Sequence, residues 1–421
     1  MMFFTGAASL RGRAFLMIYS LIGLALVSIV GMYRYDYGYF APTSDSVDGS
    51  TGDLTVAINV PPARADLDSY LQKLHRDINN EELGAFCSQD TFSKEFLTSA
   101  RQRYSNITHD NMEPVFIAIN LYNNEQILPN MATQLLALAD RLGHDRIFIS
   151  VYENGSKDKT REILQRFNET LNALNIAHRI ITDSEPKPQH VHRIEFLAKV
   201  RNLAMEPLYN SKVKYGHVLF SNDVFFCMPD VLELIFQSCA QGSHLTCVQD
   251  YYKLYGEPAF YDRWVSRDML GHRLIDEPYK LSSDRITMEA QMRDRPFQVQ
   301  CGWNGMALID AKVFQGDNGV RFRRSVEGEC SASECSLICN DMWRRGFNRL
   351  VTVPRAKLSY DLRVRNLLHR PASFPADLPY NSPEVEKITF RPGPEKILCQ
   401  PLNGIDTHDP DAPDQYINYM V

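Results

Sequence analysis

The stretch HVLFSNDVFF at residues 217–226 decides the fold of this chain. Apolar residues fill most of it, and one polar tripeptide, Ser221-Asn222-Asp223, interrupts them. This pattern predicts a buried strand that ends at the tripeptide. At the carboxyl edge of an α/β sheet, Asp223 could ligate a divalent cation that holds a nucleotide diphosphate. The alternative is a strand-to-turn junction whose polar side chains only satisfy local backbone groups.

The segments before this stretch predict a parallel sheet. Apolar runs with strand character alternate with helical patterns, at residues 114–120, 127–142, 146–152, 161–174 and 177–181. This succession is a βαβαβ unit, and right-handed crossovers make its strands parallel. The strand that carries Phe220 continues the unit. We therefore expect an α/β fold with a mainly parallel, Rossmann-type sheet.

The loop after the second predicted strand has the composition of a nucleotide-binding turn. Glu153 could accept a hydrogen bond from a ribose hydroxyl or a base N–H, and Gly155 permits a tight turn beside Asn154. Ser156 and Asp158 could cap the helix that follows. We assign these five residues to nucleotide-sugar binding. A plain loop with a good helix cap remains the alternative.

A predicted helix at residues 192–208 places two more candidates just before the strand that carries Asp223. These are Arg201 and Asn202. A guanidinium group suits bidentate contact with phosphate, so this pair could reach a phosphate or the nucleoside. Solvated charges on a helix are the alternative. Asn222 is assigned to the same nucleotide-sugar site.

The second half of the chain supplies candidates for sugar contacts. Asp250 follows an apolar run and could hydrogen-bond sugar hydroxyls at another strand end. Tyr261, Asp262 and Trp264 form an aromatic and charged patch that suits a sugar acceptor, because aromatic rings pack on sugars while carboxylates take hydroxyls. A helix with Trp264 in the core is the alternative.

The glycine-bracketed segment CGWNG at residues 301–305 precedes another apolar run. It could bring backbone N–H groups close to the donor, so Trp303 and Asn304 join the nucleotide-sugar candidates. A structural turn is the alternative.

Two acidic residues lie seven positions apart on a predicted helix at residues 333–345, and so share a face after two turns. These are Glu334 and Asp341, and we favour Glu334 as the one near the acceptor hydroxyl. Capping of the helix by Glu334 and a solvated Asp341 are the alternative. Together with Asp250 they are the catalytic candidates.

The N-terminus predicts a membrane anchor. Residues 14–32 are uncharged and long enough to cross a bilayer, and Arg11 and Arg13 precede them. The positive-inside rule leaves residues 1–13 in the cytosol and sends the rest across. We prefer an uncleaved signal anchor to a cleaved signal peptide. The sequons at Asn106 and Asn168 could then be glycosylated.

The rest of the chain divides by composition. Residues 33–112 have the character of a stem with accessory helices, 113–365 of a catalytic domain, and 366–421 of a proline-rich extension. Nine cysteines follow the apolar segment; in a secretory lumen some should pair, and the odd number leaves at least one thiol outside internal pairing. The net charge of −6, without long runs of one sign, argues against a nucleic-acid surface.

Taken in order, these segments resemble the cryptococcal-type fungal α-1,3-mannosyltransferases and their capsule-associated relatives, glycosyltransferase family 69. The resemblance covers roughly residues 113–365. Its most specific parts are YENGSKDKT at 152–160, RIEFLAKVRNLAMEPL at 193–208, FSNDVFF at 220–226, CVQDYY at 247–252, YDRWVSRD at 261–268, CGWNG at 301–305 and SECSLICNDMWRRG at 333–346.

The resemblance implies a GT-A-like fold, a GDP-mannose donor, a Mn²⁺ (or Mg²⁺) cofactor and a Golgi membrane enzyme of type II topology with a lumenal catalytic domain. It also implies a mannose-containing glycan acceptor and an α-1,3 linkage made with retention of configuration. The general acidic motif of such enzymes is Asp-x-Asp, and here Ser221 takes its first position. Asp223 is thus the single clear metal ligand. A non-catalytic export or scaffold factor for capsule or cell-wall polysaccharide is the alternative function.

Overall fold

The computed structural model describes residues 87, 103–184, 187–275, 281–316, 318–368, 387–403, 407–408 and 415–420. The expected membrane anchor at residues 14–32 lies outside this set, as do most of the expected stem and much of the proline-rich extension. No helix within the described ranges is long and apolar enough to cross a membrane. All described residues belong to the compact unit of residues 51–421.

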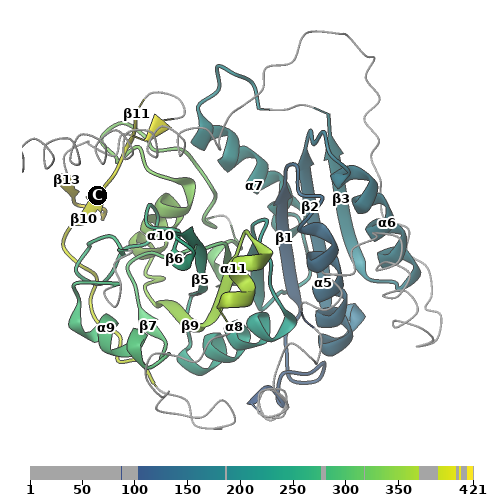
Figure 1. Ribbon diagram of the computed structural model, residues 1–421, viewed down its shortest axis with the longest axis horizontal. Coiled ribbons are helices and arrows are strands. Elements are labelled where there is room, and N and C mark those ends of the chain that lie inside the picture. Colours follow the sequence, from purple (N-terminus) through teal and green to yellow (C-terminus); the bar gives the residue numbers. More distant parts are fainter. Residues whose placement is uncertain are drawn as a thin grey trace, which may run out of the picture. The chain divides into compact units, whose positions relative to one another are not determined.

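A nine-stranded mixed sheet organises the described residues, in the order β3-β2-β1-β4-β8-β5-β9-β7, with β6 paired to β5. Figure 1 shows β3, β2 and β1 side by side. Its strands are β1 Val115–Leu121, β2 Ile147–Asn154, β3 Ala177–Asp183, β4 His217–Ser221, β5 Leu245–Leu254, β6 Glu257–Phe260, β7 Phe297–Gln298, β8 Met306–Asp310 and β9 Leu350–Ser359.

Most of the long strands run parallel. β1 pairs in parallel with β2 and β4, β2 with β3, and β5 with β9. The prediction of an α/β fold with a mainly parallel sheet is therefore confirmed. β8 is the exception with the largest consequence, because it lies between β4 and β5 and is antiparallel to both. Nothing in the apolar pattern of residues 306–309 predicts that position.

Helices cover both faces of the sheet, as the alternation of side chains in the central strands requires. In β1, Ile117 and Ile119 join the core beneath α5 (Leu128–Leu142), α6 (Thr160–Ala173) and α8 (Met228–Gln241). Phe116 and Ala118 join the opposite core, beneath α7 (Arg193–Tyr209) and α10 (Glu334–Arg344). Each fully buried Ile or Phe side chain among these stabilises the fold by roughly 1.5–3 kcal/mol.

Shorter elements complete the described part of the chain. They are the helices η1 His144–Arg146, α9 Arg285–Met292, η2 Ala311–Val313 and α11 Leu362–Leu367, the strand pair β10 Ile397–Cys399 with β13 Gln415–Ile417, and the pair β11 Leu402–Asn403 with β12 Thr407–His408.

Residues just before β1 are tied to the body by a buried ion pair. The guanidinium of Arg103 bonds to the carboxylate of Glu233 on α8, with Nε at 2.7 Å from Oε2, and the hydroxyl of Tyr104 donates to the same oxygen at 2.8 Å. All three side chains are buried. The end of the expected stem segment is therefore part of the packed core.

Three disulfides join distant segments: Cys87–Cys227, Cys301–Cys339 and Cys330–Cys399. Cys239, Cys247 and Cys335 are free thiols. The expectation that some cysteines pair and at least one does not is confirmed. The second bridge matters for the site, because it fixes the CGWNG turn to α10.

One glycosylation sequon is not accessible in the fold. Asn168 lies on α6 and is 9% exposed, and its side-chain oxygen lies 2.9 Å from Nε2 of His178. The expectation that a lumenal chain could use this sequon is therefore wrong for the folded protein. Asn106 lies in an exposed turn, so its sequon stays a prediction.

Candidate functional site

The loops after β1 and β2 are bound to each other at the carboxyl edge of the sheet. The backbone N–H of Asn123 donates to Oγ of Ser156 at 2.8 Å, and Oδ1 of Asn123 accepts from the N–H of Lys157 at 2.8 Å. The N–H of Glu125 donates to Oδ2 of Asp158 at 3.0 Å. Ser156 and Asp158 therefore bind the loop after β1 to the loop after β2.

Glu153 organises its own loop from within. Its buried carboxylate accepts hydrogen bonds from the N–H of Ser156 and from Nε of Arg161, the latter at 3.0 Å. Gly155 adopts a φ of 85°, which an L side chain would resist, and this lets the chain turn after the half-buried Asn154. The structure places all five predicted loop residues at the sheet edge.

Asp223 lies just beyond the end of β4, and Asn124 joins it to these two loops. Nδ2 of Asn124 donates to Oδ2 of Asp223 at 2.8 Å, and the N–H of Asn124 donates to Oγ1 of Thr160 at 2.7 Å. Burial raises the pKa of the Asp223 carboxyl, and the Asn124 bond opposes that rise. Sequence reasoning missed Asn124, although its place directly after a predicted strand was a usable signal.

Four predicted residues are linked by hydrogen bonds next to Asp223, which follows one of them, Asn222, in the chain. Nε of Arg201 lies 2.8 Å from Oε1 of Glu334, and Nη1 of Arg201 donates to Oδ1 of Asn222 at 3.2 Å. Nε1 of Trp303 donates to the same Asn222 oxygen at 3.3 Å. These contacts join α7, the end of β4, the CGWNG turn and α10 at one point.

An aromatic box surrounds the Arg201 guanidinium. Its central carbon lies 4.8, 5.1 and 5.6 Å from the ring centroids of Phe220, Trp303 and Phe322. Arg201 is 8% exposed and Glu334 2%. The N–H groups of this guanidinium therefore bond to Glu334 and Asn222. Arg201 acts on the site by holding the Asn222 side chain in place.

Two further predicted residues, Asn202 and Asp341, bond to other groups. Nδ2 of Asn202 donates to the carbonyl of Phe322 at 2.7 Å, and its Oδ1 accepts the Phe322 N–H at 3.2 Å, so it fixes that backbone segment. Oδ2 of Asp341 lies 2.8 Å from Nε of Arg323, in an ion network with Glu329. Asp341 and Glu334 share one helix but serve separate clusters.

Two acids, Asp250 and Asp262, are joined by a hydrogen bond. Asp250 is buried within β5, so the prediction that it lies at a strand end is wrong, whereas Asp262 follows β6 and is half-buried. Oδ1 of Asp250 accepts the N–H of Asp262 at 3.2 Å, and its Oδ2 accepts from the hydroxyl of Tyr360 at 3.3 Å. The Asp262 carboxylate accepts the N–H groups of Asn304 and Val265, each at 3.2 Å. Burial raises the pKa of both carboxyls, and the charge of Asp262 raises that of Asp250 further.

The CGWNG turn brings this acid pair close to the end of β4. The carbonyl of Gly305 accepts the N–H of Asn222 at 2.8 Å. Gly305 has a φ of 85°, and a Cβ there would lie 2.9 Å from Cγ1 of Val224 and 3.4 Å from the Tyr360 hydroxyl. Asn304 is buried and donates from Nδ2 to the carbonyl of Val248 at 2.7 Å. The turn therefore has room for no larger residue at position 305.

The predicted aromatic patch is split by the fold. Tyr261 is 39% exposed, and its ring centroid lies 5.1 Å from that of Tyr360. Nε1 of Trp264 instead donates to the carbonyl of Gln400 at 2.8 Å, which ties it to the C-terminal extension. Tyr360 belongs to the site and was not a sequence candidate, because only the β5–β9 pairing brings it to Asp250.

The site fits a metal that binds together with a nucleotide. Within the described ranges no group of three or more His, Cys, Asp or Glu residues could hold a metal ion. Asp223 offers one carboxylate at the sheet edge. Mg²⁺ is commonly held by one or two carboxylates together with substrate phosphates and water, so a single ligand is compatible with such a metal.

Asp250→Asn is expected to raise stability at neutral pH. A carboxyl whose folded pKa exceeds its unfolded value binds more protons in the folded state, so stability falls as the pH rises from about 4 through the folded pKa. The amide removes that loss, because it carries no charge to bury. Urea unfolding at pH 4.5 and 7.5 measures the effect. An unchanged pH dependence in the variant would contradict the assignment.

Comparison with known proteins gives one family match. The family model described as "Cryptococcal mannosyltransferase 1" matches residues 114–341. Alpha-1,3-mannosyltransferase CMT1 of Cryptococcus neoformans var. neoformans serotype D is 32% identical over 292 residues, which cover 64% of this chain and 62% of that protein. The match thus spans less than two thirds of the relative's length.

Solved structures resemble the chain more distantly. Mannosyltransferase PcManGT from Pyrobaculum calidifontis, in complex with GDP-Man and Mn²⁺, has a TM-score of 0.36 at 13% identity and covers 69% of this chain and 68% of its own. S. aureus TarS 1–349 has a TM-score of 0.34 at 15% identity and covers 58% and 60%. Similarity at this level carries no argument about function.

Proposed function

Because this chain belongs to the cryptococcal mannosyltransferase 1 family, we propose that it is a glycosyltransferase that moves mannose from GDP-mannose to a mannose-containing glycan. The linkage we propose is α-1,3, made with retention of configuration on a GT-A-like fold. The observation that carries the proposal is the position of Asp223, which Asn124 holds at the sheet edge where α/β folds bind nucleotides.

The donor half of the site comprises the joined loops after β1 and β2 together with Asp223 and Asn222. Asn124 orients the Asp223 carboxylate through its 2.8 Å bond, and Arg201 with Trp303 orients the Asn222 amide. A bound Mn²⁺ or Mg²⁺ would neutralise the diphosphate as it leaves. The protein would then contribute by holding the Asp223 carboxylate and the Asn222 amide in fixed orientations.

The sugar half comprises Asp250 and Asp262, with Tyr261 and Tyr360 beside them. The half-buried Asp262 carboxylate could accept from sugar hydroxyls, orient the acceptor or stabilise positive charge on the sugar. The fully buried Asp250 would act through its hydrogen bond to the Asp262 N–H. Retention requires no single inverting base. Glu334 bonds to Arg201 rather than lining this half, so we assign it a positioning role through Arg201 and Asn222.

The test is a donor screen with the full-length protein in detergent. GDP-mannose and the other common sugar nucleotides are offered with an α-mannoside acceptor, with Mn²⁺ and after chelation. We expect transfer from GDP-mannose that depends on the metal. Absence of transfer or hydrolysis with every donor would favour the alternative, a non-catalytic export or scaffold factor. Transfer from another donor would correct the substrate.

For the location we propose a Golgi membrane protein of type II, anchored by residues 14–32 with its body in the lumen. The three disulfides are consistent with an oxidising compartment.

Asn106→Gln is expected to remove a glycosidase-sensitive mass from the protein expressed in a fungal host, because Asn106 is exposed in a lumenal body. Asn168→Gln is the matched control and should leave the glycan mass unchanged, since Asn168 is buried. Mobility on gels with and without glycosidase measures both. A protein without any such mass would speak against the lumenal location.

A further inference from the structure

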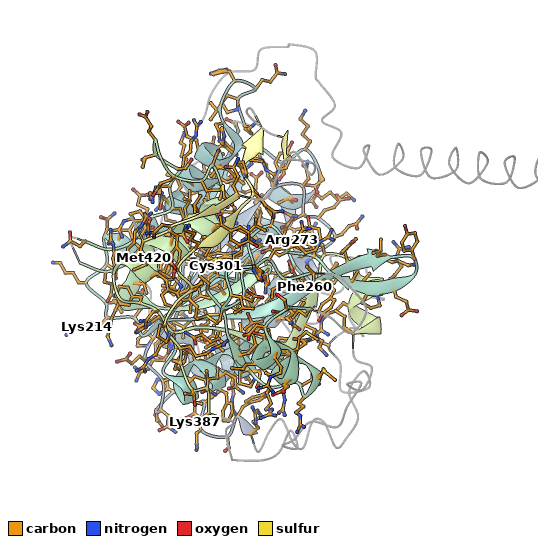
Figure 2. All side chains as sticks on the ribbon, turned by 90° about the vertical axis from the view of Figure 1, so that its left-hand side faces the viewer. Lys214, Phe260, Arg273, Cys301, Lys387 and Met420 are labelled. Carbon is orange, nitrogen blue, oxygen red and sulfur yellow. A yellow bond between two sulfur atoms is a disulfide. The ribbon has the colours of Figure 1, made fainter. Side chains whose placement is uncertain are left out.

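The β5–β6 hairpin extends beyond the main sheet next to the acid pair. Its register pairs Tyr252 with Ala259 and Leu254 with Glu257, and β5 is paired with β9 only as far as Tyr251. Figure 2 shows the hairpin running outward, with Phe260 labelled at its base. Tyr255 at the turn is 85% exposed. The tip of the hairpin is therefore exposed.

Three tyrosines form a row from this hairpin to the acid pair. The ring centroids of Tyr252 and Tyr261 lie 5.8 Å apart with planes at 66°, and those of Tyr261 and Tyr360 lie 5.1 Å apart at 56°. Neither contact is a parallel stack. The three rings come from β5, the residue after β6 and the residue after β9, so distant parts of the chain build one aromatic surface.

The inner end of the row is polar. The hydroxyl of Tyr360 donates to Oδ2 of Asp250 at 3.3 Å, and Oδ1 of Asp250 accepts the N–H of Asp262 at 3.2 Å. An aromatic surface that leads to the half-buried Asp262 carboxylate has the two features that bind a sugar chain, since rings cover its apolar faces and a carboxylate accepts from its hydroxyls.

We propose that the row of Tyr252, Tyr261 and Tyr360 binds the inner units of an oligomannoside acceptor, whose terminal unit lies at Asp262. This inference rests on the proposed function and specifies its acceptor as a chain rather than a single sugar. It places Tyr252 in the site. It also removes Trp264 from the predicted acceptor residues, because its indole bonds to the carbonyl of Gln400.

Contacts to parts of the acceptor far from the reacting atoms stabilise the ground state and the transition state equally. They therefore raise kcat/KM for long acceptors relative to short ones. The measured quantity is the ratio of kcat/KM for a linear α-mannotetraose to that for methyl α-mannoside, with full-length protein and GDP-mannose. Tyr252→Ala is expected to lower this ratio about tenfold, the upper range for loss of one aromatic contact. Tyr252→Phe keeps the ring and should keep most of the ratio.

Tyr416→Ala is the matched control, because Tyr416 is a 45% exposed tyrosine on β13 and outside the row. Its ratio should equal that of the wild type. If Tyr252→Ala folds poorly, Tyr261→Ala supplies the same measurement. An equal ratio in the row variant and in Tyr416→Ala would overturn the proposal.

A second readout separates this inference from the proposed function. Saturation-transfer NMR with α-mannotetraose and no donor is expected to give signals from inner sugar units that Tyr252→Ala loses. If the wild-type protein transfers mannose but the tetraose signals do not depend on Tyr252, the row is wrong and the function stands. If no transfer occurs with any donor yet these signals depend on Tyr252, the function fails and the glycan surface stands.

Discussion

Asp223→Ala is expected to lower metal-dependent mannose transfer by about 10³-fold or more, because it removes the carboxylate that we propose as the metal ligand. Asn124→Ala should cost about 10- to 100-fold, since Asn124 only orients that carboxylate through its 2.8 Å bond. Initial rates with GDP-mannose over a Mn²⁺ titration measure both. Chelation should bring the wild-type protein down to the level of Asp223→Ala.

Asp140→Ala is the control for this comparison, because Asp140 is an exposed carboxylate on α5 and takes no part in the site. It should retain the wild-type rate and the wild-type response to Mn²⁺. A protein with Asp223→Ala that still responds to Mn²⁺ would remove Asp223 from the metal site and would leave the donor half without a carboxylate ligand.

Arg201→Met is expected to lower the free energy of unfolding by about 3–5 kcal/mol, because it leaves the buried Glu334 carboxylate without its partner. The double variant Arg201→Met with Glu334→Leu should recover much of that loss, since no unpaired charge then stays buried. Urea unfolding measures all three proteins. Activity should fall in both variants, because Asn222 loses its Nη1 donor.

Arg324→Met is the matched control for the ion pair. Arg324 pairs with Glu195 at 3.4 Å, but both side chains are about half exposed, so water already screens the charges. Its loss should cost about 0–1 kcal/mol. If Arg201→Met proved as mild as Arg324→Met, the Arg201 cluster would contribute little to the fold, and its contact with Asn222 would be its main role.

The candidate site joins features that lie near each other in sequence with features that do not. Asp223, Asn222 and the loop from Glu153 to Asp158 follow predicted strands directly, and parallel strands deliver their carboxyl ends to one edge. For these residues the pattern predicted the placement. Tyr360 and the pairing of Glu334 with Arg201 gave no local signal, because each depends on a partner more than 100 residues away.

The sequence by itself determined the alternating strands and helices of the first half, since burial on both sheet faces leaves continuous apolar runs and amphipathic helices leave a 3.6-residue period. It also determined that polar side chains follow the first, second and fourth strands, although it wrongly placed Asp250 at a strand end. Such patterns report what one segment buries, and they hold no information about which other segment covers it.

Only the tertiary structure decided which of those ends meet. The insertion of β8 antiparallel between β4 and β5 brings the CGWNG turn against Asn222, and the pairing of β9 with β5 brings Tyr360 to Asp250. The physical reason is that strand order depends on packing and hydrogen bonding summed over the whole sheet. The sequence therefore predicts that Asp223 follows a strand, while the fold decides which residues surround it.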